Sequence, residues 1–139
     1  MKIFFVVNQY SDFLNTIYDD NEYLKNLPFI EQAKALKQHF LTPGVLWANA
    51  LTEQDYEVSY FFSNAFYCQK KWAEENNITY NEKNWEADIS VAQIAKEKPD
   101  ILFSTDWSEQ YGPHFIERCK QAGAKFVVGW CGEAHPPIT

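Results

Sequence analysis

The second half of the chain, residues 88–136, constrains the fold more than any other stretch. A helical pattern of apolar residues ends before Pro99, and the short apolar run 101–103 follows it. After a polar loop, a second helical segment leads into another apolar run at 126–128. Short apolar runs that alternate with helical segments are typical of a parallel sheet whose strands are joined by helices.

In such sheets, ligands gather at the loops that follow the carboxyl ends of the strands. The loops in question here are 104–108 and 131–135, which we expect to lie on one rim of the molecule. The search for a functional site therefore starts at that rim.

The composition indicates one globular domain and excludes some partners. The chain has 139 residues, of which 46% are hydrophobic, and this is enough for a single domain with a core. Its net charge of −7 disfavours nucleic acids and anionic membranes. The apolar run near the amino terminus, 3–7, is too short for a signal segment or a membrane span. Three widely spaced cysteines suit a reducing cytoplasm, where we expect the protein to be.

Periodicity along the chain predicts alternating strands and helices from end to end. Strands are expected at 2–7, 56–62, 100–104 and 125–130. Helices are expected at 28–40, 45–52, 64–76, 85–97 and 111–121, with a short helix or an ordered loop at 12–18.

Right-handed crossovers would place these helices on both faces of the sheet. We therefore expect a single Rossmann-like α/β domain over residues 1–139, with three αβα layers and a mainly parallel sheet of at least four strands. The expected strand order is 3-2-1-4, or an equivalent with the first strand central. Because a Rossmann-like half has five or six strands, the chain is expected to be cut short after the fourth.

Two common kinds of site are disfavoured. The loop after the first strand, 8–11, contains no glycine, so it lacks both the GxGxxG pattern of dinucleotide sites and the glycine-rich phosphate loop. Cys131 and His135 are four residues apart, but no close cysteine pair accompanies them, and we expect no metal.

Several stretches follow one another in an order and spacing that resemble a known enzyme family. They include Tyr10-Ser11-Asp12-Phe13-Leu14, Trp47-Ala48-Asn49-Ala50-Leu51, Lys98-Pro99-Asp100-Ile101-Leu102-Phe103 and Val127-Val128-Gly129-Trp130. Together they resemble the amino-terminal domain of bacterial glycosyltransferases with the GT-B fold, the CgeB-like and family 1-type proteins. The resemblance covers nearly the whole chain.

The resemblance implies an acceptor-binding domain of an enzyme that transfers a sugar from a nucleotide-sugar donor. The donor would be held on a carboxy-terminal domain of the same protein, which these 139 residues do not include. The acceptor would be a glycan, a protein or a small molecule. We therefore expect no cofactor in this chain and no turnover by the isolated domain.

Three residues of the rim are candidates for the catalytic base. Asp106 follows the third strand, where a carboxylate could accept the proton of an acceptor hydroxyl, although it could equally cap the next helix. Glu133 and His135 follow the fourth strand, and both residue types can act as a base. A solvated hinge explains that segment equally well.

Other rim residues are candidates for substrate binding. Asn8, Gln9 and Tyr10 could hydrogen-bond an acceptor, and Tyr10 or Phe13 could stack on it, although turn formation and packing account for them as well. Trp107 lies in a rim loop and is expected to be a ligand platform. The tryptophans at helical spacing are expected in the core; they are Trp47, Trp72 and Trp85.

A different class of function remains open: a stand-alone, flavodoxin-like binding or interaction module without catalysis. A receiver domain would need paired acids after the first strand, and Asn8 and Gln9 do not supply them. The aromatic content of 17% favours the glycosyltransferase hypothesis, because a domain that faces another carries extra apolar surface.

Overall fold

The computed structural model describes residues 1–39, 42–105 and 111–130. Their helices and strands, in chain order, are β1 (Lys2–Val7), α1 (Ser11–Asp20), the 3-10 helix η1 (Glu22–Asn26), α2 (Phe29–His39), α3 (Pro43–Glu53), β2 (Glu57–Phe62), α4 (Phe66–Glu75), α5 (Trp85–Glu97), β3 (Ile101–Ser104), α6 (Pro113–Gln121) and β4 (Phe126–Gly129).

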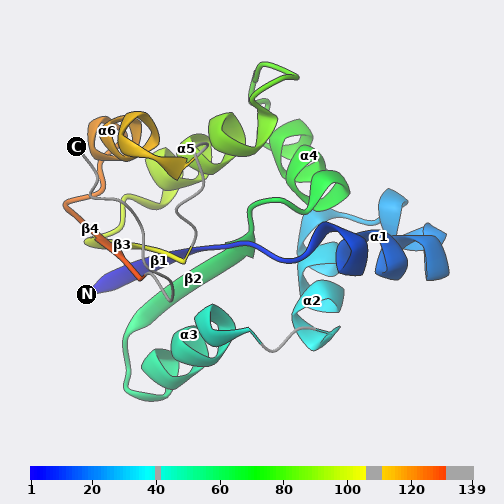
Figure 1. The fold of residues 1–139 in the computed structure, drawn as a ribbon, viewed down its shortest axis with the longest axis horizontal. Helices are drawn as coiled ribbons and strands as arrows, with labels where there is room; N and C mark the ends of the chain where they lie inside the picture. The colour runs from blue at the N-terminus through cyan, green and yellow to red at the C-terminus, as the bar shows by residue number, and fades with distance from the viewer. Residues whose placement is uncertain (40–41, 106–110, 131–139) are drawn as a thin grey trace.

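The fold is α/β, as predicted, with a sheet in which all four described strands are parallel (Figure 1). The strand order is β2-β1-β3-β4. The prediction that β1 lies inside the sheet is confirmed, but the literal order 3-2-1-4 is wrong, because β3 rather than β4 is the second neighbour of β1. Contacts between the starts of these strands fix the pairing. Lys2 donates its N–H to Asp100 Oδ2 at 2.8 Å, and Asp100 donates its N–H to Lys2 O at 2.9 Å.

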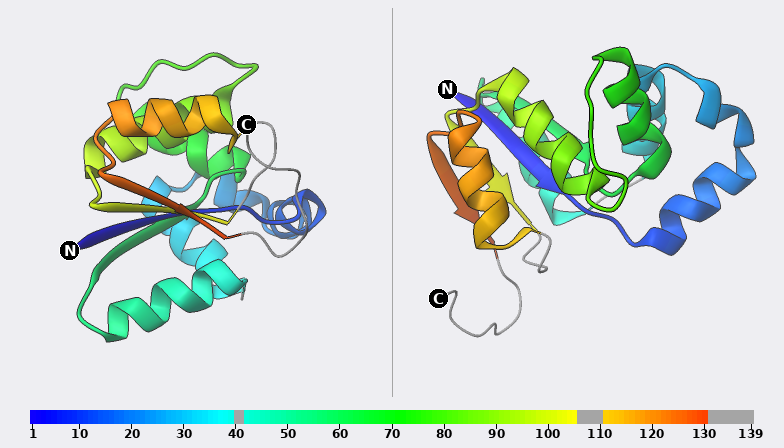
Figure 2. Two further views of the ribbon diagram at one scale, coloured as in Figure 1. Left: turned by 60° about the vertical axis from the view of Figure 1, so that its left-hand side comes forward. Right: turned by 90° about the horizontal axis from the view of Figure 1, so that it is seen from above.

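Side chains of β1 point alternately into two cores, one on each face of the sheet. Phe5 belongs to the core that α3 covers, whereas Phe4 belongs to the core covered by α5 and α6. Figure 2 shows α5 and α6 on one side of the sheet and α3 on the other. The three αβα layers follow from this alternation, because β1 is apolar at every position from Ile3 to Val7 and can bury both of its faces.

A second group of helices extends the domain at one end. α1, α2 and α4 lie together beyond the carboxyl ends of β1 and β2 (Figures 1 and 2). The segment predicted as a short helix or an ordered loop is a helix, α1. This group of helices lies beside the carboxyl edge of the sheet, where ligands of α/β folds gather.

Local signals account for several helix ends. Thr42 caps α3, its hydroxyl oxygen accepting the Val45 N–H at 3.4 Å. α5 ends at Glu97, and its C-cap, Lys98, has a left-handed φ of 47° and precedes Pro99. Gly123, with a φ of 118°, follows the end of α6, where a glycine readily adopts the left-handed conformation.

The tryptophans expected in the core are buried to different degrees. Trp72 is buried, whereas Trp47 and Trp85 are half-buried and pack against the core.

Among the helices of the described residues, none is both long and apolar enough to cross a membrane.

Candidate functional site

The loops that leave the strands converge on a pocket of about 370 Å³ at the carboxyl edge of the sheet. Each strand contributes through the residues that follow it, and the first turn of α3 forms a further wall. The lining residues are Asn8, Gln9, Tyr10, Thr42, Pro43, Gly44, Asn64, Thr105 and Trp130. The pocket therefore lies at the rim that the sequence pattern indicated.

Asn64 holds the loop after β1 through that loop's backbone. The Gln9 N–H donates to Asn64 Oδ1 at 3.0 Å, and Asn64 Nδ2 donates back to Gln9 O. The asparagine side chain thus pairs with Gln9 as one more residue of β2 would pair with β1. Since the backbone of Gln9 is held in this way, its side chain and that of Tyr10 are left to line the pocket.

Ser63 orients Asn8 at the same edge. The Ser63 N–H donates to Val7 O at 2.9 Å and continues the sheet ladder by one residue. The Ser63 hydroxyl, which is buried, lies within hydrogen-bonding distance of both Val7 O and Asn8 Oδ1. The Asn8 carboxamide is therefore held by its oxygen from inside the protein.

A glycine lets α3 approach the ends of β1 and β3. A Cβ atom on Gly44 would lie 3.1 Å from Val7 Cγ2 and 3.2 Å from Thr105 Cγ2. Both separations are shorter than an ordinary van der Waals contact between carbon atoms. The absence of a side chain at Gly44 thus sets how closely the first turn of α3 closes the pocket.

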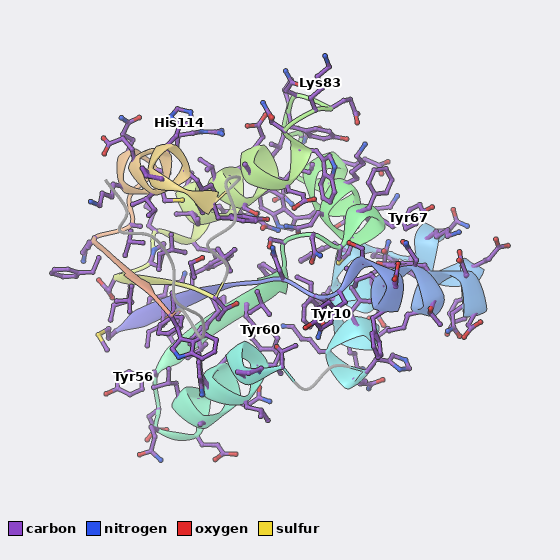
Figure 3. All side chains as sticks on the ribbon, in the orientation of Figure 1. Tyr10, Tyr56, Tyr60, Tyr67, Lys83 and His114 are labelled. Atoms are coloured by element: carbon purple, nitrogen blue, oxygen red, sulfur yellow. The ribbon has the colours of Figure 1, made fainter. Side chains whose placement is uncertain are left out.

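Two aromatic rings border the pocket, and they differ in the contacts that hold them in place. Trp130 packs edge-on against Trp47, with ring centroids 5.3 Å apart, and Trp47 packs in turn on Phe103 at 5.7 Å. Tyr10 lies where β1 passes into α1 and is 79% exposed (Figure 3). A ligand in the pocket would therefore meet two exposed rings, of which Trp130, 44% exposed, is supported by Trp47.

All nine described lining residues are uncharged. They offer carboxamides, hydroxyls and apolar surface, but no ammonium or guanidinium group for a phosphate. They also include no carboxylate or imidazole that could take up a proton near neutral pH. The described part of the pocket is thus equipped for binding rather than for acid–base chemistry.

Nucleophiles and metal ligands are not gathered elsewhere in the described residues. Burial raises the pKa of Cys68 and of Cys119 to about 12, so both thiols stay protonated and unreactive. Within the described part of the chain, no three metal-ligating side chains cluster.

The predicted substrate-binding residues have different places. Asn8, Gln9 and Tyr10 come together in the pocket. Phe13 is exposed on α1 and lines neither this pocket nor the smaller one described below. The other candidates, Asp106, Trp107, Glu133 and His135, lie outside the described residues.

Sequence reasoning did not single out several lining residues. Asn64, Thr105 and Trp130 each follow a strand, so their place after a strand could have marked them. Gly44 offered no such signal, because its contacts are with residues remote in the sequence.

No protein-family model, curated protein or solved structure matches the chain.

Proposed function

We propose that the pocket at the carboxyl edge of the sheet binds an uncharged, hydroxyl-rich ligand, namely a sugar residue. The observation that carries this proposal is the uncharged lining of carboxamides, hydroxyls and two aromatic rings. A carboxamide both donates and accepts hydrogen bonds, as sugar hydroxyls require. The rings of Tyr10 and Trp130 offer flat apolar faces for the C–H side of a pyranose.

We further propose that this ligand is the acceptor of a glycosyl transfer. The acceptor hydroxyl oxygen would form the new bond to the anomeric carbon of the donor sugar, and the nucleoside diphosphate would leave. The sequence resemblance to the amino-terminal half of GT-B glycosyltransferases supports this reaction class. The described lining residues carry no cationic side chain, which agrees with an acceptor site, because a donor pyrophosphate is usually bound by cations.

The proton of the acceptor hydroxyl needs a base that the described lining does not provide. Asp106, Glu133 and His135 remain the candidates for this role. Asp106 directly follows Thr105 in the sequence, and Thr105 lines the pocket.

A stand-alone binding module for phosphate-bearing ligands is the second candidate. The observation that favours it is the first turn of α3, which forms one wall of the pocket. Backbone N–H groups at a helix amino terminus attract anions. Inorganic phosphate therefore belongs in the binding experiment beside the sugars.

The proposal is tested by measuring affinities for methyl glycosides of common hexoses and N-acetylhexosamines. Tyr10→Ala should weaken binding about fivefold, which corresponds to the loss of one stacking ring. Tyr23→Ala is the matched control, because Tyr23 is 64% exposed on η1 and lines neither pocket. Equal losses in the two variants would contradict the proposal, as would a protein that binds phosphate but none of the glycosides.

A further inference from the structure

A second, smaller pocket of about 200 Å³ lies between α1, α4 and α5. Its lining residues are Ser11, Leu14, Asn15, Tyr18, Asn64, Phe66, Tyr67, Trp85 and Glu86. Of the residues that the structure describes, only Asn64 lines both pockets. The first pocket draws a wall from α3 and the second draws walls from α4 and α5, and Figure 1 shows α3 and α5 on opposite sides of the sheet.

Aromatic side chains form much of this second pocket. Phe66 and Trp85 pack edge to face with ring centroids 5.4 Å apart, and Tyr18 and Tyr67 lie 4.9 Å apart. Phe66 and Tyr67 keep 43% and 37% of their surfaces exposed. Rings that are held by neighbours and still reach solvent are suited to stacking on a ligand.

The polar groups of the second pocket differ from those of the first. Among the described lining residues, Glu86 is the one that carries a formal charge, and its carboxylate accepts a hydrogen bond from the Tyr111 hydroxyl at 3.2 Å. Asn15, exposed on α1, adds a carboxamide.

We propose that this pocket is a second carbohydrate-binding site, which takes one uncharged sugar ring. The Glu86 carboxylate would accept hydrogen bonds from sugar hydroxyls, and such charge-assisted bonds are stronger than neutral ones. Asn15 would donate to and accept from a neighbouring hydroxyl. The apolar face of the sugar would stack on Trp85, because lysine ammonium groups lie over the Phe66 and Tyr67 rings.

Charge argues against ionic ligands in this pocket. The Glu86 carboxylate repels phosphates and carboxylates. A cationic ligand is disfavoured because two of the rings already carry protein ammonium groups. Lys25 Nζ lies 5.0 Å from the Tyr67 ring centroid, and Lys70 Nζ lies 4.3 Å from that of Phe66. A neutral ring with hydroxyl groups satisfies the acceptor and the donors without either repulsion.

The test is a titration of the protein with methyl hexosides, followed through backbone amide resonances. Saturable shifts should appear at Asn15, Phe66 and Trp85. Glu86→Gln should weaken that binding about tenfold, and Asn15→Ala about fivefold, as expected for a charged and a neutral hydrogen bond. Asn49→Ala is the matched control, because Asn49 is exposed on α3 and lines neither pocket.

The proposal is independent of the first pocket, because Tyr10→Ala should leave the shifts at Asn15 and Trp85 unchanged. If the first pocket does not bind sugars, the Tyr10-dependent binding should be absent, while the shifts at Asn15 and Trp85 should still appear. The second site would be overturned if Glu86→Gln bound as tightly as Asn49→Ala. It would also be overturned if tetramethylammonium or phosphate shifted the same amides more strongly than any glycoside did.

Discussion

Gln69 of α4 and Gln93 of α5 hydrogen-bond each other through both of their side-chain amide groups. Gln69 Nε2 lies 3.1 Å from Gln93 Oε1, and Gln93 Nε2 lies 2.7 Å from Gln69 Oε1. Both side chains are buried, with exposed fractions of 0% and 1%. The pair satisfies two amides inside the protein and ties together the helices whose first turns line the second pocket.

Breaking this pair from one side should destabilise the fold. Gln69→Leu leaves the Gln93 amide buried without its partner, which should lower the free energy of unfolding by about 1–3 kcal/mol. The double variant Gln69→Leu/Gln93→Leu should lose less than the sum of the two single variants, because it leaves no orphaned amide. Urea unfolding measures all three, with Gln38→Leu on the exposed surface of α2 as control. Additive losses would contradict the reciprocal pairing.

A side chain at Gly44 should push α3 away from the sheet. Gly44→Ala places a Cβ close to Val7 and Thr105, and overpacking of this kind costs about 1–3 kcal/mol. The better helix propensity of alanine offsets about 1 kcal/mol of this loss. We expect a net loss in unfolding free energy that Thr105→Ser, which removes the contacting methyl group, partly restores. A Gly44→Ala variant at least as stable as the parent would contradict this prediction, because Val7 and Thr105 would then move aside at no cost in unfolding free energy.

Asn64 should contribute more to the free energy of unfolding than an exposed asparagine does, because its side chain hydrogen-bonds the backbone of Gln9. Asn64→Ala removes both hydrogen bonds to the Gln9 backbone and should lower the free energy of unfolding by about 1–3 kcal/mol. Asn64→Asp keeps the acceptor for the Gln9 N–H and loses only the donor, so its loss should be intermediate. Asn49→Ala should change little. The order of the three unfolding midpoints checks the prediction, and equal values would refute it.

Asp100 should make stability depend on pH in acid. A hydrogen bond from Lys125 Nζ to Oδ1, 2.6 Å long, and a second from the Lys2 N–H lower the pKa of the Asp100 carboxyl group. A pKa that is lower in the folded than in the unfolded chain stabilises the fold above the unfolded value, near pH 4, and this stabilisation is lost as pH falls through the folded value. Urea midpoints measured from pH 6 to pH 3 should therefore decline less steeply in Asp100→Asn. Identical slopes in the two proteins would contradict the assignment.

The sequence predicted elements whose signals are local. Helix α5 begins at Trp85 and ends at Glu97, as expected, because its periodicity and the stop at Pro99 lie within one stretch. β1 likewise spans the apolar run. The inner position of β1 was predicted correctly, but the literal order 3-2-1-4 was wrong, because the second neighbour of β1 is fixed by contacts such as that between Lys2 and Asp100, which are 98 residues apart.

The candidate site was predictable in part for the same reason. Gln9 and Tyr10 follow a strand that could be recognised, so the loop rule placed them on the rim. The pairing of Asn64 with Gln9 joins residues 55 positions apart, and no local sequence pattern predicts it. A buried glutamine such as Gln69 likewise looks like any surface glutamine until its partner is known.

The most direct test of the account is where a sugar binds on the protein. A nitrogen–proton correlation spectrum should be recorded as a methyl glycoside is titrated to saturation. We expect the amides of Asn8, Gln9 and Thr105, which line this pocket and not the second one, to shift together with a single dissociation constant, and Tyr10→Ala to weaken all three responses. Shifts that spare this edge of the sheet, or none with any glycoside while phosphate moves the amides of Gly44 and Val45, would contradict it.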